Sequence, residues 1–89
     1  MLYMIIEEFK SGPSPVYARF KKRGRMAPNG LTYIGSWVTS DMSRCYQVME
    51  CAERELLEDW MAHWSDLVRF EVVPLITSAE AAQAAAALH

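Results

Sequence analysis

The hydrophobic positions of the chain form short segments, and four of these segments have the pattern of β-strands. Each is rich in aromatic and β-branched residues, shows little helical period, and is bounded by glycine, proline or short polar residues. The predicted strands are 2–9, 31–40, 44–50 and 68–77. The segment 41–43 is too short for a crossover, so the strands on either side of it should pair antiparallel. Pro74 cannot donate to a ladder, which places the last strand at an edge or a bulge.

Three other segments predict helices. Ser14 and Pro15 are typical of an N-cap and a first helical turn, and this helix should extend to about Arg23. Residues 53–65 form a second helix, with one wide apolar stripe and acidic residues in its first half, where the helix dipole favours negative charge. Ser78 should cap an alanine-rich helix that runs to residue 88.

The order βαββαβ followed by a terminal helix predicts one α+β domain of the ferredoxin-like type. Such a domain has a four-stranded antiparallel sheet with two helices packed on one face. Residues 1–77 make up this domain, and residues 78–89 form a C-terminal alanine-rich helix or arm of the same domain. The apolar face of that arm is weak, so we expect it to lie on a neighbouring molecule or to fray in water.

The strands lack the alternation of apolar and polar residues that a sheet covered on one side normally shows. Residues 2–6 are apolar at both parities, and so is most of 68–76. Both faces of the sheet therefore require burial, which predicts a homodimer formed through the sheet face. The alternative is a monomer whose terminal helix folds back over the open face.

Composition and charge exclude several classes of partner. The net charge of −2 and pI near 5.6 give no general attraction for nucleic acid or for an anionic membrane surface. No apolar run is long enough to span a bilayer, and the N-terminus lacks the pattern of a signal peptide. We therefore expect a cytoplasmic protein with no nucleic-acid or membrane partner.

The two cysteines, Cys45 and Cys51, do not form part of a zinc-binding pattern, because no second Cys or His pair stands at the required spacing. Within one strand they would also be too far apart for a disulfide. We expect free, partly buried thiols and no bound metal or other cofactor.

Trp37 and Gln47 are the leading candidates for a binding site. If Tyr46 and Val48 join Ile34 and Val38 on one face of the sheet, then Gln47 lies opposite Trp37 on the other face. Tyr33, Gly35 and Met49 would then lie beside this pair, and an amide among such side chains is typical of a site for a small aromatic or apolar ligand. The alternative is a tryptophan in a dimer core that bonds the glutamine.

Three further features carry possible chemistry. His63 borders the apolar stripe of the second helix, where it could ligate a haem iron or shuttle a proton, or simply expose its polar edge. Glu7 or Glu8 could approach Glu50 as a pair of carboxylates, although glutamates at strand ends usually face solvent. The basic run 19–25 could attract an anion, pair with the acidic half of the second helix, or remain solvated.

The chain resembles a known family over nearly its whole length. The residues that carry the resemblance are Met1-Leu2-Tyr3-Met4 with Glu7 and Phe9, Gly30-Leu31 with Ser36-Trp37-Val38, Arg44-Cys45-Tyr46-Gln47 with Met49-Glu50, and Trp64-Ser65-Asp66-Leu67 through Phe70-Glu71-Val72-Val73-Pro74. This set is similar to the domain of unknown function 3303 family, small bacterial proteins of the dimeric α+β barrel type. More distant members of that superfamily include cofactor-free quinol monooxygenases, haem-degrading enzymes and chlorite dismutase-like proteins. The resemblance implies a dimer and a pocket between sheet and helices, but no particular reaction.

These observations leave three hypotheses for function. The first is a homodimeric binding module for a small apolar or aromatic ligand, with Tyr33, Trp37, Gln47, Met49 and His63 as candidate pocket residues. The second is a cofactor-free monooxygenase-like or haem-related enzyme that uses Trp37, Gln47 and His63. The third is a dimer with a purely structural role. An open cavity with convergent polar groups would favour the first two hypotheses.

Overall fold

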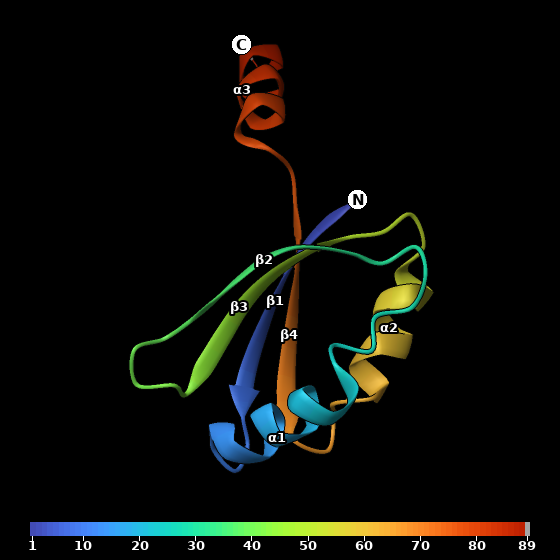
Figure 1. Ribbon diagram of the computed structural model, residues 1–89. Coiled ribbons are helices and arrows are strands. Elements are labelled where there is room, and N and C mark those ends of the chain that lie inside the picture. Colours follow the sequence, from blue (N-terminus) through green and yellow to red (C-terminus); the bar gives the residue numbers. More distant parts are fainter. Residues whose placement is uncertain (89) are drawn as a thin grey trace.

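The computed structural model describes residues 1–88 and contains four strands and three helices (Figure 1). In chain order these are β1 (Leu2–Phe9), α1 (Pro13–Arg23), β2 (Thr32–Val38), β3 (Arg44–Glu50), α2 (Arg54–Ala62), β4 (Val68–Leu75) and α3 (Ser78–Ala87). The predicted α+β fold with βαββαβ order and a terminal helix is confirmed, and β1 and β3 have the predicted bounds. The other elements are a few residues shorter or shifted.

The strands form a single antiparallel sheet in the order β2-β3-β1-β4, which is the ferredoxin-like topology. The two central strands pair with Ile5 opposite Gln47 and Glu7 opposite Cys45. Strand β4 lies at an edge of the sheet, and its Pro74 stands opposite Tyr3. Proline has no backbone N–H to donate, so it fits a strand that pairs on one side only. The prediction of an edge position for Pro74 is confirmed.

Helices α1 and α2 both lie on one side of the sheet, which we call the covered face (Figure 1). The core lies under them and draws on one parity of each central strand, with contributions from α2 and β4. Its members are Tyr3, Ile5, Phe9, Leu31, Cys45, Met49, Cys51, Leu57, Trp60, Trp64 and Val68. In β1 the buried positions alternate strictly with half-buried ones, because successive side chains point to opposite faces.

The opposite side of the sheet, which we call the open face, has no helix over it. It presents the other parity of the four strands, and its apolar members are Leu2, Met4, Ile6, Trp37, Tyr46, Val48, Val73 and Leu75. A row of charged residues crosses one end, where Glu8 pairs with Arg69 at 2.9 Å and approaches Arg44 at 4.0 Å. Helix α3 extends away from the sheet and buries none of its residues, so it does not fold back over this face (Figure 1).

Two predicted caps are wrong. Helix α1 begins at Pro13 after Gly12, whose φ of 77° favours glycine, and Ser14 lies inside the first turn. Helix α3 is capped by Thr77 rather than Ser78: the Thr77 side chain accepts from the Glu80 amide while the Glu80 side chain accepts from the Thr77 amide. Between residues 1 and 88, no helix has both the length and the apolar character needed to cross a membrane.

Candidate functional site

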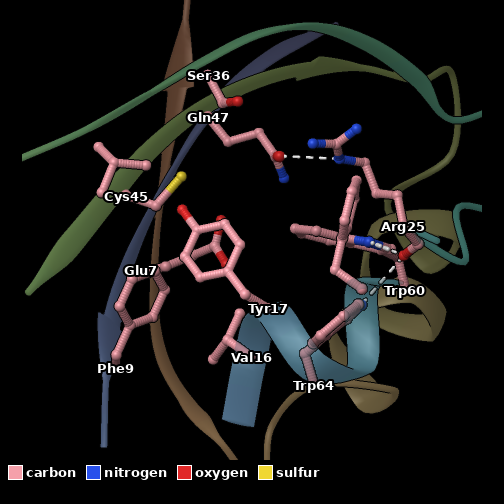
Figure 2. Close-up of a pocket in the computed structure, with 12 residues that line it drawn as sticks. Glu7, Phe9, Val16, Tyr17, Arg25, Ser36, Cys45, Gln47, Trp60 and Trp64 are labelled. Carbon is pink, nitrogen blue, oxygen red and sulfur yellow. Dashed lines mark hydrogen bonds between the residues drawn. The ribbon is translucent and has the colours of Figure 1, made fainter. Parts of the chain in front are cut away.

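A cavity of about 260 Å³ lies between the covered face of the sheet and the helices (Figure 2). Its apolar walls are Phe9, Val16, Tyr17, Phe20, Val38, Trp60 and Trp64, and its polar groups belong to Glu7, Arg25, Ser36, Cys45 and Gln47. Tyr17, Phe20 and Val38 each keep about 40% of their surface exposed, so the mouth lies between α1 and β2. An apolar cavity of about 150 Å³ is enough to hold benzene. This cavity therefore has room for a substituted single ring.

Two tryptophans fix the segment that enters the cavity after α1. Trp60 and Trp64 are four residues apart, so their indoles lie on the same side of the α2 segment. Both indole Nε1 groups donate to the backbone carbonyl of Arg25, at 3.0 and 3.1 Å. The two buried rings thus form a wall of the cavity and, through the same carbonyl, hold Arg25 in place.

The Arg25 side chain places a positive charge beside the cavity. Its Nε donates to the Gln47 Oε1 at 3.1 Å, and its guanidinium carbon lies 3.8 Å from the centre of the Tyr33 ring and 5.2 Å from that of Phe20. Within residues 1–88 no ion pair includes Arg25. The guanidinium is therefore held by an amide and by aromatic faces, and a carboxylate partner is missing from this part of the chain.

Gln47 is 3% exposed and links the cavity to the core. Its Oε1 accepts from Arg25, while its Nε2 lies 3.5 Å from the Met49 sulfur, a weak acceptor. A buried amide whose N–H groups meet only a weak acceptor keeps donor capacity for a further partner. Gln47 can therefore orient a ligand that carries an oxygen.

Glu7 is the second charged group of the cavity, and it lies on the side away from Arg25, near Tyr17 and Cys45 (Figure 2). Burial raises its pKa from an ordinary value of 4.5 to about 7, although a hydrogen bond with Cys45 and the charge of Arg25 act in the opposite direction. Burial and the nearby Glu7 raise the pKa of Cys45 to about 12. Burial, Cys45 and Glu7 also raise the pKa of Tyr17. Near neutral pH Glu7 can therefore exchange a proton, whereas Cys45 stays a thiol and is a poor nucleophile.

The predicted pairing of Trp37 with Gln47 is wrong. An irregularity between Tyr33 and Gly35 shifts the register of β2, so that Ser36 stands opposite Gln47 and Trp37 stands opposite Tyr46. Gln47 consequently lines the cavity on the covered face, while Trp37 lies on the open face with 62% of its surface exposed. The two side chains point to opposite sides of the sheet.

The other predicted site residues are also distributed. Tyr33 lies beside the cavity under the Arg25 guanidinium, with its hydroxyl 2.6 Å from the Ser36 Oγ. Met49 is fully buried in the core next to Gln47. His63 is exposed at the C-terminal end of α2, outside the cavity. Trp37, Gln47 and His63, which the enzymatic hypothesis combines, are therefore not brought together.

The charged residues meet the expectations only in part: Lys21, Lys22 and Arg23 are exposed, as in a solvated basic run. Glu7 lies opposite Cys45 and faces the covered side, whereas Glu50 lies opposite Leu2 at the other end of the sheet, so the two form no carboxylate pair. In the basic run, Arg19 makes a bidentate pair with Asp66 at 2.7 Å rather than with the acidic half of α2. The Arg19 guanidinium in turn holds the pKa of Asp66 near 2. Cys45 and Cys51 are free and buried.

Glu7, Arg25 and the tryptophan pair are not among the predicted pocket residues: Glu7 is considered only for a carboxylate pair with Glu50, and Arg25 only as a member of the basic run. One sequence feature could have identified Glu7: it shares the parity of Tyr3, Ile5 and Phe9, so an acidic residue interrupts a buried face. Arg25 lies in an irregular segment, and its backbone is held by bonds from residues 35 and 39 positions away in sequence. Among the residues that the structure describes, no three His, Cys, Asp or Glu side chains converge in a way that could hold a metal ion.

Comparison with known proteins identifies a family. The family model described as a domain of unknown function, DUF3303, matches residues 1–89. No curated protein and no solved structure matches the chain.

Proposed function

We propose that this chain, which belongs to the DUF3303 family, binds a small aromatic molecule in the cavity between the covered face and the two helices. The observation that carries the proposal is the composition of that cavity. Aromatic walls surround a space of about 260 Å³, and a cation, an amide and a buried carboxyl group line it. Ligand sites are typically mostly apolar, with a few polar groups that fix orientation.

The polar groups in the cavity support binding rather than core packing. A buried carboxyl group raises the free energy of the folded state unless it is well paired, and the same holds for an arginine without an acidic partner. Glu7 and Arg25 do not form an ion pair with each other, and the space between them is unfilled (Figure 2). A ligand that occupies this space would give both groups a partner.

Titration with single-ring compounds tests this proposal. Benzoate, benzamide and phenol should perturb the amide and indole NMR signals of Trp60 and Trp64, which line the cavity, and leave those of Trp37 unchanged. Val16→Phe should fill the cavity and abolish these shifts, whereas Ala18→Phe, on the exposed side of the same helix, should preserve them. The proposal fails if none of the three compounds shifts the Trp60 and Trp64 signals.

We further propose that two copies of the chain associate through their open faces. The supporting observation is the set of eight apolar side chains on this face, which neither the two covering helices nor α3 buries. Two such sets, if each side chain gained about half of its full burial, would contribute on the order of 12–24 kcal/mol. This gain is comparable with the roughly 4–15 kcal/mol that association costs. The same face of a second copy carries the same apolar set, so the two faces can pack against each other.

Light scattering on a gel-filtration peak tests the association. The wild-type chain should elute as a dimer at micromolar concentration, and Val48→Lys, at the centre of the open face, should give a monomer of about the 10.2 kDa chain mass. Ala62→Lys, on the exposed surface of α2, is the matched control and should remain dimeric. A monomeric wild-type chain would refute the homodimer and leave the cavity proposal standing.

A further inference from the structure

The cavity has two chemically different sides. Glu7, the Tyr17 hydroxyl and the Cys45 thiol lie on one side, and Arg25 and Gln47 lie on the other, with open space between them (Figure 2). Building on the proposed function, we propose that the ligand is a small aromatic carboxylate, which Arg25 binds, and that its binding is coupled to the uptake of a proton by Glu7.

The choice of a carboxylate follows from the state of Arg25. A guanidinium can donate two parallel hydrogen bonds to a carboxylate, and this geometry is the strongest that arginine offers. In Arg25 the Nε is used by Gln47, and the ring of Tyr33 lies against the guanidinium at 3.8 Å, so the group is already oriented before a ligand arrives. The indole N–H groups of Trp60 and Trp64 are used by the Arg25 carbonyl. The walls therefore supply aromatic surface, and Arg25 supplies the charge.

The coupling to a proton follows from the groups that face Glu7. Tyr17 faces it from α1, Cys45 from β3, and Arg25 from the segment after α1. Elsewhere in residues 1–88, the neighbours of Glu7 on the covered side carry no charge: Phe70 on β4, Val38 and Ser36 on β2, and Trp60 and Trp64 from the α2 segment. Arg25 is thus the cation that favours the ionised form of Glu7.

A ligand carboxylate changes this balance. It neutralises Arg25 and adds a negative charge to a poorly solvated space, so the ionised form of Glu7 becomes less favourable. Glu7 then takes one proton from solvent, its carboxylate becomes a carboxylic acid, and the ligand itself is unchanged. The neutral carboxyl group can donate a hydrogen bond, which the carboxylate cannot.

Calorimetric titration of the wild-type chain with benzoate tests the coupling. At pH 7.5, titrations in phosphate and in Tris, which differ in ionisation enthalpy, should show uptake of up to roughly three quarters of a proton per benzoate. Between pH 7 and 9 the Kd should weaken by up to about tenfold per pH unit, and below pH 6.5 it should be nearly constant. Benzamide, which has the same ring and no charge, should bind without proton uptake.

Three variants separate the contributions. Glu7→Gln, which keeps the shape of the side chain, should bind benzoate with no proton uptake and with a Kd independent of pH. Arg25→Gln should lose most of the benzoate affinity and keep that for benzamide, whereas Arg23→Gln, on the exposed end of α1, should behave as wild type. Because the buffer comparison uses the wild-type chain, the inference remains testable if a variant fails to fold.

The outcomes also distinguish this inference from the proposed function. If benzamide or phenol shifts the Trp60 and Trp64 signals and benzoate does not, the cavity binds aromatic rings but the carboxylate inference is wrong. If benzoate binds without proton uptake in either buffer, the role of Glu7 is refuted and that of Arg25 stands. If none of the three compounds binds, both proposals fail.

Discussion

The two faces of the sheet are built from the same strands, yet each carries residues that the other would accommodate better. The covered face buries Glu7 and Gln47 within the core side of β1 and β3. The open face leaves Ile6, Val48 and Trp37 without a covering layer. Exchanging the two sets would favour stability, since apolar side chains gain from burial and charged ones lose by it.

This difference agrees with the two proposals, a ligand site on the covered face and an interface on the open face. On the covered face the polar side chains converge on one space, as the proposed ligand site requires. On the open face the apolar side chains spread across the four strands and end at a row of charges, as the core and polar rim of the proposed interface would. The following experiments measure how far the two faces differ.

The largest expected effect comes from two adjacent isoleucines of β1. Ile5 is fully buried on the covered face, so Ile5→Ala should lower the free energy of unfolding by about 2–5 kcal/mol, independently of protein concentration. Ile6 is half-buried on the open face, so in dilute solution Ile6→Ala should lower the free energy of unfolding much less than Ile5→Ala does. If the chain dimerises, the effect of Ile6→Ala should grow with protein concentration, because the Ile6 side chain stabilises the association of two copies.

Urea denaturation followed by circular dichroism at two protein concentrations makes this measurement. Equal losses for Ile5→Ala and Ile6→Ala at both concentrations would contradict the distinction between the faces.

The second effect is a dependence of stability on pH that originates at Glu7. Its pKa in the folded chain is about 7, above the ordinary value of 4.5, so the folded state holds the proton more tightly than the unfolded state does. Below pH 4.5 Glu7 is protonated in both the folded and the unfolded state, so the free energy of unfolding does not depend on its ionisation. As the pH rises from 4.5 to 7, the unfolded state releases the proton first, and the free energy of unfolding falls. The loss should reach about 3 kcal/mol above pH 7.

Glu7→Gln should remove this dependence and make the chain more stable than wild type at pH 8. Glu8→Gln is the matched control, because Glu8 is the next residue and lies on the open face with Arg69. Urea midpoints measured from pH 4.5 to 8 would refute the assignment if Glu8→Gln flattened the profile and Glu7→Gln did not.

The sequence predicts the fold better than it predicts the site, for identifiable reasons. Element type follows from local patterns, so the strands β1 and β3 were located to the residue. The pairing of β2 depends on an irregularity near Gly35, and a shift of one residue moved Trp37 to the other face. The sequence pattern of a single strand does not show where its register against the neighbouring strand shifts.

Arg25 shows a second limit of the sequence. It belongs to a basic run whose other members are mostly exposed, and nothing in the run distinguishes it. Its side chain donates to Gln47, and its backbone carbonyl accepts from Trp60 and Trp64. A helical stripe identifies the two tryptophans only as core. Glu7 is expected in a carboxylate pair or at a solvent-facing strand end, although the parity of β1 places it on the buried face.

A third, smaller effect concerns the two tryptophans that hold the Arg25 backbone, Trp60 and Trp64. Trp64→Phe removes one of two indole bonds to the Arg25 carbonyl, so the free energy of unfolding should fall by about 0.5–1.5 kcal/mol, and binding in the cavity should weaken. Trp37→Phe, on the open face, should change unfolding of the monomer by less than about 0.5 kcal/mol and leave cavity binding unchanged. Weaker cavity binding in Trp37→Phe than in Trp64→Phe would contradict the assignment of the two residues to different faces.

The smallest effect concerns α3, which packs on neither face. Thr77 and Glu80 form a capping box at its start, and such a cap stabilises a helix by about 0.5–2 kcal/mol. A ten-residue helix that buries none of its side chains is marginal in water, so its own stability is not linked to that of the sheet. Thr77→Ala should therefore lower the helical signal at 222 nm and leave the urea midpoint of the core within error. Ser78→Ala, at the position next to the cap, should change neither quantity. If Thr77→Ala instead shifts the midpoint at high protein concentration only, then α3 packs against a second copy, and the open face is not the whole of the interface between them.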